Sequence, residues 1–400
     1  MIPIQQATQI VLNHTRNFGT EKVSFTESLG RVLQEDLCAD REFPPFTRVT
    51  MDGIAIQYEA FAAEERTFLI EGLQAAGMAQ KTLQEAGNCL EVMTGAILPK
   101  NVDTVIRYED LEIADGKATI VIDSIRERQN AHRQGNDRKT GDLIVPKGRV
   151  ISSAEIGVAA TVGKTHLEVN RLPKVVIIST GDELVEVGEM PLPHQIRKSN
   201  VYSLQMALLQ WGIVAETRHL PDDKELIRHE LSQYLEAFEV IILSGGVSKG
   251  KLDFVPEVLE ELKVEKLFHK VAQRPGKPFW FGKTADDGVH IFALPGNPVS
   301  SFMCAHRYVQ PWLRKSFGLA SFKEEFAVLK KDFHFRPALT YFLQVKLEYG
   351  KDGRLWAVPI EGKGSGDLAN LVDADGFLEL PSDARNDFAE GEAFRLMRFR

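Results

Sequence analysis

The sequence predicts an α/β multidomain protein, in which a doubly wound, mainly parallel α/β domain is joined to a β-rich second domain and a C-terminal β domain. The chain has 400 residues, which is more than one hydrophobic core usually supports. Strand-like and helix-like segments alternate over 171–318, a pattern typical of a parallel sheet covered on both faces. Short β-branched runs fill 44–140, and period-2 runs return after 319.

The elements are expected in the following order. Apolar residues at helical spacing indicate an amphipathic helix over 3–18. The α/β part should begin with a strand at 174–179, followed by a helix from 200 that is capped by Ser199 and stopped at Gly212. A second helix is expected over 223–238, opening on Asp222 with Glu225 in a capping box. The remaining elements are a strand at 240–244, a helix near 254–262, β-runs to 283, a strand at 290–294 and a helix entered through Asn297 and Pro298. Ligands are expected at the carboxyl ends of the parallel strands.

Composition and charge exclude several classes of protein. The formal net charge of -8, from 48 basic and 56 acidic residues, argues against nucleic-acid binding, which needs a basic face. Cys38, Cys89 and Cys304 lie far apart, without CxxC spacing or companion histidines, so neither zinc nor a disulfide is expected. The sequence shows no leader-like segment and no apolar run of membrane-spanning length, so we expect a cytoplasmic protein without a membrane partner.

Three loops should meet at one edge of the sheet, because each follows a predicted strand: "STGDEL", "SGGVSKGKLDF" and "LPGNPVSS". Gly245 and Gly246 allow a tight turn whose backbone N–H groups can approach a phosphate or another oxyanion. The third loop leads into a helix N-terminus, which favours an anion. Asp182, Glu183 and Asp253 could hold magnesium together with substrate phosphate oxygens, although each alone could be a helix cap or a surface acid.

A set of longer motifs extends this interpretation over most of the chain, from about 44 to 381. They are "PPFTRVTMDGIAI", "MTGAILP", "STGDELVEVG", "SGGVSKGKLDF", "RPGKPFWFG", "ALPGNPVSSF" and "GKGSGDLANLVDADGFLELP". In these motifs and their order the chain resembles the molybdopterin molybdenumtransferase family, to which the C-terminal domain of gephyrin also belongs. A match of this length is far more specific than one glycine-rich loop.

The resemblance implies an elongated protomer of four domains. These are an elongated N-terminal, dimerisation domain (1–43 and 141–170), a β-rich inserted domain (44–140), the α/β molybdopterin-binding domain (171–318) and a C-terminal β-barrel-like domain (319–400). It implies a homodimer whose active site lies between the α/β domain of one subunit and the β-rich domain of the other. The implied reaction inserts molybdate into the dithiolene of adenylylated molybdopterin, cleaving the phosphoanhydride with Mg²⁺ and releasing AMP. The molybdopterin adenylyltransferase and molybdoenzyme acceptors are the expected partners.

The resemblance also assigns roles to individual residues. The implied catalytic residues are Asp182, Glu183 and Asp253 from the α/β domain and Asp52 and Asp137 from the β-rich domain, with Glu183 and Asp253 as metal ligands. The residues expected to bind substrate are Thr94, Ser244, Gly245, Gly246, Ser248, Arg274, Lys277, Pro295, Gly296, Asn297, Pro298 and Ser365.

The sequence departs from the family pattern in several places. Lys198 stands where the family usually has an acidic residue before "SN", and Arg274 replaces a lysine, which keeps the positive charge. His132 and Asn136 occupy a loop that usually reads "RxxGED"; we assign His132 no catalytic role. Lys249 and Lys251 replace an apolar and an acidic residue. With Lys198 they predict a cleft that is more positive than usual, with tighter anion binding and a weaker metal site.

Two other functions are compatible with these observations. The charge reversals suggest a catalytically weakened homologue that binds molybdopterin or the finished cofactor as a carrier or scaffold. Enzymes of the preceding adenylyl transfer step share the α/β domain, although the additional β-rich domains argue against that function.

Overall fold

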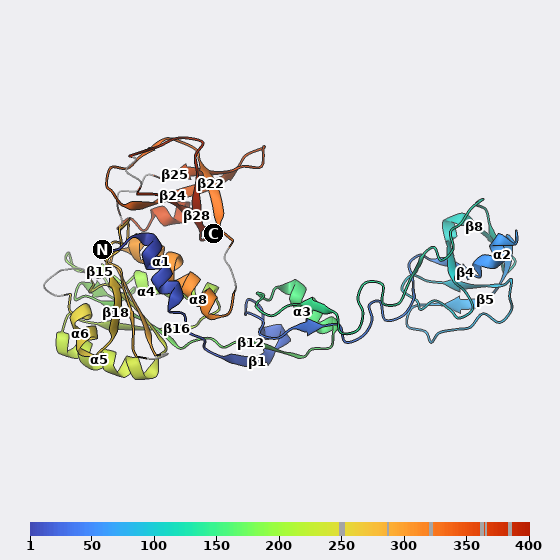
Figure 1. Cartoon of the computed structure of the whole chain (residues 1–400), viewed down its shortest axis with the longest axis horizontal. Coiled ribbons are helices and arrows are strands. Elements are labelled where there is room, and N and C mark those ends of the chain that lie inside the picture. The colour runs from blue at the N-terminus through green and yellow to red at the C-terminus, as the bar shows by residue number, and fades with distance from the viewer. Residues whose placement is uncertain (248–252, 286–287, 320–322, 361–363, 365, 383–385) are drawn as a thin grey trace.

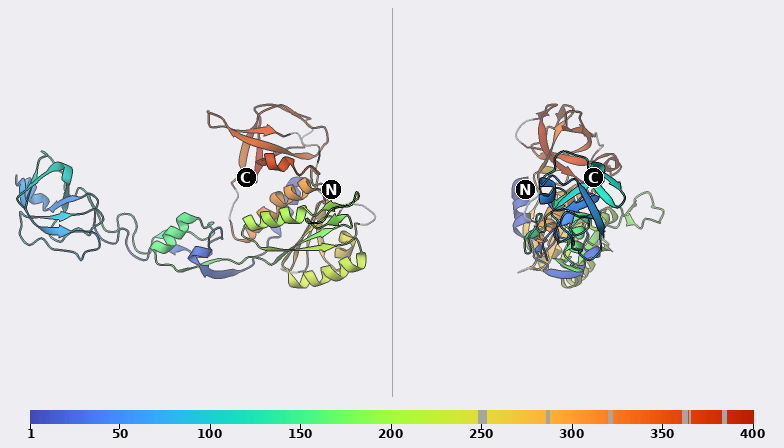
Figure 2. Two further views of the ribbon diagram at one scale, coloured as in Figure 1. Left: turned by 180° about the vertical axis from the view of Figure 1, so that it is seen from behind. Right: turned by 90° about the vertical axis from the view of Figure 1, so that its right-hand side faces the viewer.

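The structure, a computed structural model, describes the whole chain except residues 248–252, 286–287, 320–322, 361–363, 365 and 383–385. The molecule is elongated: Figure 1 shows the α/β part and the C-terminal barrel at one end and a small β-rich part at the other, joined through a short middle part. The view from behind in Figure 2 shows the same separation. The predicted α/β multidomain class is confirmed.

The α/β part is built on a six-stranded sheet of order β16-β13-β17-β21-β20-β18. The first four of these strands run parallel, whereas β20 is antiparallel to β21 and β18 is antiparallel to β20. The strands are β13 (Val175–Thr180), β16 (Ala215–Leu220), β17 (Val240–Ser244), β18 (Glu265–His269), β20 (Trp280–Lys283) and β21 (His290–Leu294). The short strands β14 (Leu184–Val185) and β15 (Ile196–Arg197) pair beside the sheet.

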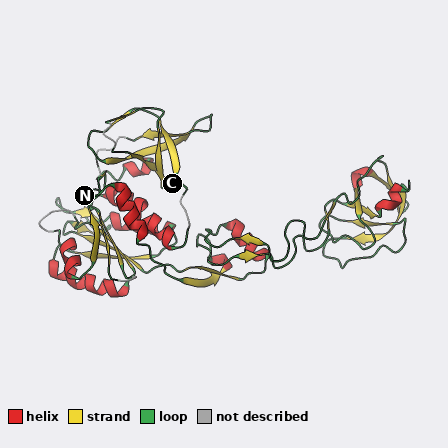
Figure 3. Cartoon of the chain, viewed as in Figure 1, coloured by secondary structure: helices red, strands yellow, loops and turns green. Residues whose placement is uncertain are grey.

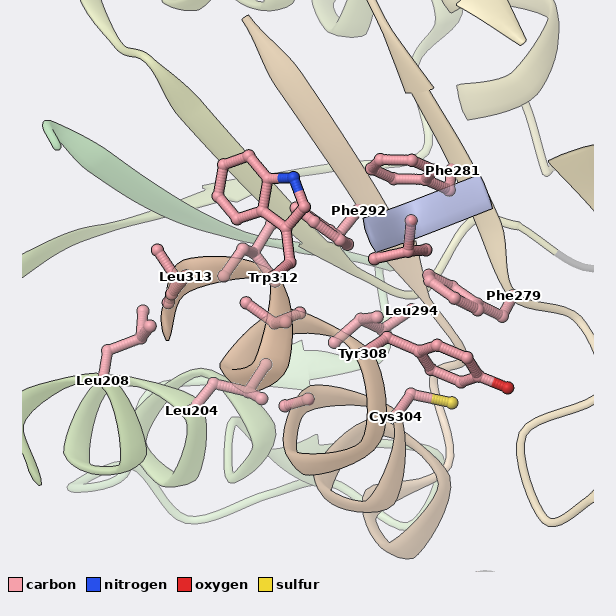
Figure 4. Close-up of a cluster of buried hydrophobic side chains, with 14 of the residues drawn as sticks. Leu204, Leu208, Phe279, Phe281, Phe292, Leu294, Cys304, Tyr308, Trp312 and Leu313 are labelled. Carbon is pink, nitrogen blue, oxygen red and sulfur yellow. The ribbon is translucent and has the colours of Figure 1, made fainter. Parts of the chain in front are cut away.

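Helices cover both faces of this sheet (Figure 3). They are α1 (Ile4–Asn13), α4 (Asn200–Gln210), α5 (Lys224–Ala237), α6 (Val255–Glu261), α7 (Pro298–Cys304) and α8 (Gln310–Ser316), with a π-helical turn, η3 (Ala305–Val309), between α7 and α8. Because successive strand residues point to opposite faces, Val175 and Ile177 join a core with α1, α4, α7 and α8, while Val176 and Ile178 join a second core with α5 and α6. Figure 4 shows aromatic rings filling the first core, with Trp312 beside Phe292.

The helix ends differ in part from the sequence-based expectation. The first helix is shorter than 3–18, and its buried residues Ile4, Ala7 and Val11 lie in the core of the α/β part. Helix α4 begins after Ser199, whose side chain makes no capping hydrogen bond. Helix α5 is capped by Asp223, so the expected capping box from Asp222 to Glu225 is wrong: Asp223 Oδ1 accepts the Leu226 N–H at 2.9 Å. Only one of two adjacent acids can occupy the N-cap, and Asp222 is left at the ligand edge.

The C-terminal part is a small barrel. Strands β24, β25, β22, β28 and β26 follow one another, and β26 pairs back to β24, which closes the ring. These strands are β22 (Glu325–Leu329), β24 (Thr340–Tyr349), β25 (Leu355–Pro359), β26 (Gly376–Leu380) and β28 (Ala393–Arg398). Outside the ring lie β23 (Phe333–His334), which pairs with β27 (Asp387–Phe388), the helix α9 (Asn370–Asp373) and β19 (Gln273–Arg274). Strand β19 comes from the α/β part and pairs in parallel with the start of β24, so the two parts are joined by backbone hydrogen bonds.

The remaining parts are smaller. The middle part pairs β1 (Thr20–Ser24) with β12 (His166–Asn170) and β2 (Leu37–Cys38) with β11 (Leu143–Val145), around η1 (Phe25–Glu27) and α3 (Ser153–Thr161). The β-rich part has a six-stranded sheet of order β7-β4-β6-β5-β9-β8. Its elements are β3 (Arg48–Val49), β4 (Gly53–Ile56), α2 (Tyr58–Ala62), β5 (Thr67–Gln74), β6 (Cys89–Val92), β7 (Thr104–Arg107), η2 (Tyr108–Asp110), β8 (Leu111–Ala114), β9 (Lys117–Ile120) and β10 (Ala131–His132).

The capping geometry of α5 predicts a difference between two neighbouring acids. Asp223→Ala should lower the free energy of unfolding by about 1 kcal/mol, because it removes the acceptor for an otherwise orphaned N–H group. Glu225→Ala should change it by less than about 0.5 kcal/mol, because Glu225 is exposed and its pair with Arg228 lies at the surface. Denaturant unfolding of both variants checks this, and equal losses would show that Glu225 shares in the cap.

Candidate active site

The carboxyl ends of the parallel strands form the wall of a cleft of about 890 Å³. Ser179 of β13 lies opposite Ser244 of β17, and Ser244 lies opposite Leu294 of β21, so the three following loops start side by side. The cleft is lined by Ser179, Thr180, Gly181, Glu183, Leu184, Ile196, Arg197, Lys198, Ser199, Asn200, Val201, Asp222, Ser244, Gly245, Gly246, Val247, Asp253, Pro278, Pro295, Gly296, Asn297, Pro298 and Gly366. The structure therefore brings together most of the residues that the sequence places in the α/β site.

The glycine turn after β17 is packed too closely for any side chain. Gly245 and Gly246 have φ of +108° and +67°, which side chains rarely adopt. A Cβ on Gly245 would lie 2.9 Å from the Thr180 hydroxyl, and one on Gly246 would lie 2.8 Å from the same atom. The two glycines thus let the backbone of one loop approach the end of the neighbouring strand, and they leave bare backbone along the cleft.

Asn200 holds the loops together. Its Nδ2 donates to the Ser244 hydroxyl at 2.9 Å and to the Gly296 carbonyl at 2.6 Å, so the first residue of α4 links the loops after β17 and β21. The Ser301 hydroxyl donates to the Pro295 carbonyl and fixes the third loop to α7. Sequence analysis missed Asn200, because it was interpreted as part of a helix start.

Acidic groups gather along one side of the cleft. Glu183, Asp222 and Asp253 line it, and Asp182 accepts the Asp222 backbone N–H at 3.1 Å. Burial raises the pKa of the Asp222 carboxyl, and the negative charges of Asp182, Glu183 and Asp253 raise it further. Asp222 is a candidate functional residue that sequence analysis assigned to a helix cap; the signal was the doublet of acids, of which only one could be the cap.

No group of three or more His, Cys, Asp or Glu side chains forms a preassembled metal site in the described part of the chain. Magnesium seldom needs one, because it is usually bound by one or two carboxylates together with water and substrate phosphate oxygens. Glu183 and Asp253 lie on the same cleft, as a shared ion requires.

A second cavity of about 410 Å³ adjoins the cleft and shares Pro278, Pro295 and Asn297 with it. It lies between the α/β part and the barrel. Arg274 and Lys277 line one side, and Gln344 of β24 lines the other; its buried side-chain oxygen, Oε1, has no hydrogen-bond partner among the described residues. Sequence analysis placed both cations in the site but had no signal for Gln344.

The expected excess of positive charge at Lys198 is reduced by an ion pair. Lys198 lines the cleft but is only 9% exposed, and its Nζ lies 2.5 Å from Glu186 Oε1. Burial lowers the pKa of the neighbouring His219, and the positive charge of Lys198 lowers it further. The reversal at Lys198 is thus compensated locally. Lys249 and Lys251, the other two cations of that hypothesis, lie outside the described residues, as do Ser248 and Ser365.

The predicted residues of the β-rich part form a separate group. Asp52 Oδ1 accepts the backbone N–H of Thr94 at 2.6 Å and its hydroxyl at 2.7 Å, and these bonds lower the pKa of Asp52. Asp137 Oδ1 lies 2.9 Å from His132 Nε2, which gives that histidine a structural partner. Within one chain the β-rich part and the α/β part lie at opposite ends of the molecule (Figure 1).

Comparison with known proteins agrees with this geometry. The chain matches three family descriptions: "MoeA N-terminal region (domain I and II)" over residues 2–163, "Probable molybdopterin binding domain" over 176–315 and "MoeA C-terminal region (domain IV)" over 327–399. It is thus a MoeA-type multidomain protein. A Synechocystis protein named molybdopterin molybdenumtransferase is 41% identical over 397 residues, covering 98% of this chain and 99% of the relative. The chain belongs to the molybdopterin molybdenumtransferase family.

Other relatives show the same extent of similarity. A molybdopterin molybdenumtransferase of Staphylococcus epidermidis is 30% identical, covering 96% of this chain and 92% of the relative. The crystal structure of the molybdopterin biosynthesis MoeA protein from Pyrococcus horikoshii, at 32% identity, superimposes with a TM-score of 0.83 over 100% of this chain and 99% of that chain. No helix among the described residues is both long and apolar enough to cross a membrane.

The crowding of carboxylates predicts how stability depends on pH. The pKa of Asp222 is higher in the folded than in the unfolded chain, so this group costs stability as pH rises from its unfolded pKa of about 3.9 toward its raised folded pKa. Asp222→Asn removes that cost and should raise the melting temperature more at pH 7 than at pH 3.5. Thermal unfolding at both pH values measures this. An equal change at both would mean that neither burial nor the neighbouring carboxylates raise the pKa of Asp222.

Proposed function

We propose that the protein inserts molybdate into the dithiolene of adenylylated molybdopterin and releases AMP. Membership of a family whose curated relatives are named molybdopterin molybdenumtransferase supports this. The observation that carries it is the pair of adjoining cavities: three carboxylates line the larger one, beside Arg197 and the ion-paired Lys198, whereas Arg274 and Lys277 line the smaller one without a carboxylate among the described residues. An acidic cleft with bare glycine backbone suits a phosphoanhydride with its metal ion, and a small basic cavity beside it suits a tetrahedral dianion such as molybdate.

In the larger cleft, the backbone at Gly245 and Gly246 would face the phosphate oxygens, and Asn200 would keep the surrounding loops in place. The carboxylates there would repel an anionic substrate if no cation were bound between them. Glu183 and Asp253, with Asp222 beside them, would hold Mg²⁺, which would supply charge neutralisation at the anhydride and at the departing AMP. The repulsion that raises the pKa of Asp222 supports this assignment, because a bound cation would relieve it.

In the smaller cavity, Arg274 and Lys277 would bind molybdate. The Arg274 guanidinium presents a planar set of donors to two oxygens at once, whereas the Lys277 ammonium acts as a point charge. The dithiolene of a substrate in the larger cleft would reach the molybdenum across the shared wall of Pro278, Pro295 and Asn297. The product then passes to molybdoenzyme acceptors, and an adenylyltransferase must supply the substrate.

We further propose a homodimer in which a second subunit supplies Asp52, Thr94 and Asp137 to the cleft. Within one chain, the β-rich part lies at the other end of the molecule from the α/β part (Figure 2). Helix α4, which begins at the cleft, presents an exposed stripe at helical spacing, formed by Met206, Leu209 and the ring of Tyr202, whose hydroxyl donates to Glu186. A second copy of this chain packed on the stripe would stand next to the cleft opening.

The carrier or scaffold function, kept as an alternative, rested on the charge reversals. The ion pair between Lys198 and Glu186 weakens the argument for that function. Lys198 is the one charge reversal within the described residues, and Glu186 neutralises its charge beside the cleft. Incubation of the purified chain with adenylylated molybdopterin, molybdate and Mg²⁺ separates the two functions. Release of AMP with formation of the cofactor supports the enzyme, whereas binding without AMP release supports the carrier.

Asp253 provides the sharpest test of the acidic side. Asp253→Ala should reduce AMP release by about 100-fold or more, because a charged group at the reacting anhydride is lost, and should leave the melting temperature nearly unchanged. Asp223→Ala is the matched control, since it should lower stability and keep turnover. If the Asp253 variant loses stability and retains turnover, Asp253 is a structural residue.

The dimer proposal predicts that one charge on the stripe separates the subunits. Met206→Asp should yield a monomer by light scattering and abolish turnover, because a carboxylate would be buried in the contact. Phe326 of β22, exposed at 55% against 49% for Met206 but located in the barrel, provides the control variant Phe326→Asp, which should remain dimeric and active. A fully active Met206→Asp monomer contradicts the shared site.

A further inference from the structure

The turn that carries both cations of the smaller cavity is held by a buried hydrogen-bonded chain. Gln273 is completely buried, and its carboxamide uses both ends: Oε1 accepts from the Tyr308 hydroxyl at 2.5 Å, and Nε2 donates to the Gly276 carbonyl at 3.0 Å. Nε2 also lies 3.4 Å from the Cys304 sulfur. Gln273 directly precedes the turn from Arg274 to Lys277. Its side chain thus connects that turn, at the Gly276 carbonyl, to the helical segment that carries Cys304 and Tyr308.

We propose that Gln273 and Tyr308 are positioning residues, which set the spacing of Arg274 and Lys277 and thereby determine how tightly the cavity holds a tetrahedral oxyanion. The inference rests on the proposed function, in which this cavity takes molybdate. It deepens that function, because it assigns the affinity for the oxyanion to two residues that carry no charge.

The turn needs such support for two physical reasons. Arg274 and Lys277 are like charges three residues apart on the same cavity, so their repulsion favours opening the turn. Gly276 has a φ of +90°, and a Cβ there would lie 2.6 Å from Cys304 Sγ and 2.7 Å from Gln273 Nε2. The turn is therefore pressed against the buried carboxamide.

The partners of Gln273 are themselves fixed. Tyr308, in the π-helical turn of residues 305–309, packs against Phe279 with ring centroids 4.8 Å apart and ring planes tilted by 34°. Figure 4 shows its hydroxyl and the Cys304 sulfur directed to the same side. Arg307, the residue before Tyr308, forms an ion pair with Glu379 of β26, with Nε and Oε2 3.2 Å apart. This ion pair connects the helical turn to the barrel. On the other flank, Gln273 and Arg274 pair with Thr340 and Tyr341 of β24.

The direction of each hydrogen bond is determined by its partners. The Gly276 carbonyl can only accept, so the nitrogen of Gln273 must face it, and the oxygen must then face Tyr308. Burial raises the pKa of Tyr308 far above its usual value, so its hydroxyl remains a donor. Without the Tyr308 hydroxyl, the Gln273 carboxamide can rotate, and the hydrogen bond that holds the Gly276 carbonyl is then lost.

The experiment compares full-length variants by titration calorimetry with sodium molybdate as the probe. Tyr308→Phe keeps the ring on Phe279 and should weaken molybdate binding about 10-fold, with AMP binding to the larger cleft unchanged within about 2-fold. In turnover, the KM for molybdate should rise with kcat unchanged at saturation. Tyr234→Phe, on α5 at the opposite face of the sheet, is the matched control and should change neither affinity.

A second variant guards against a folding defect. Gln273→Met should weaken molybdate binding at least as much as Tyr308→Phe, and the double variant should add little, because both changes break one chain of bonds. If Arg274→Ala and Lys277→Ala weaken molybdate binding and the positioning variants lower only the melting temperature, the positioning role is overturned and the proposed function stands. If Arg274→Ala and Lys277→Ala also leave molybdate binding unchanged, or the parent binds no molybdate, the molybdate cavity itself is overturned.

Discussion

The parallel register of β13, β17 and β21 is the constraint on which the site depends. Ser179, Ser244 and Leu294 lie opposite one another, so three loops leave the sheet at one level and must pack side by side. That crowding explains the glycines: the turn after β17 touches the Thr180 hydroxyl, and only backbone fits between them. A side chain there would separate the loops, and the cleft that they share would no longer have a continuous wall.

Among the described residues, carboxylates line only the larger of the two cavities, an arrangement that suits a reaction with two anionic substrates. Carboxylates gather where a metal ion would accompany phosphate oxygens, and cations gather where a free oxyanion would bind. Proline and asparagine side chains form the shared wall, which keeps the two sets of charge apart. The pairing of Lys198 with Glu186 belongs to the same division, because it prevents a buried cation from acting as a counter-charge inside the acidic cleft.

The barrel contributes to the site through the backbone as well as through side chains. Strand β19, which ends at Arg274, pairs with β24 and continues directly into the turn that leads to Lys277. The ion pair of Arg307 with Glu379 bridges the same two parts at a buried position. The position of the barrel is thereby coupled to the geometry of the smaller cavity, whereas the β-rich part lies at the far end of the molecule (Figure 1).

The sequence by itself determined the class of fold, the mainly parallel sheet and the membership of the three strand-end loops in one site. These follow from local patterns, because β-branched runs, helix spacing and glycine turns depend on neighbours in the chain. Capping could not be predicted as well, because Asp222 and Asp223 are the same residue type side by side. Only the folded backbone shows that Asp223 caps α5 and that Asp222 lines the cleft. Only the tertiary structure shows that Glu186 neutralises Lys198, that Asn200 connects two loops and that Gln273 bonds to Tyr308. Each of these contacts joins residues from different elements, and the packing that sets it is not encoded in any local pattern.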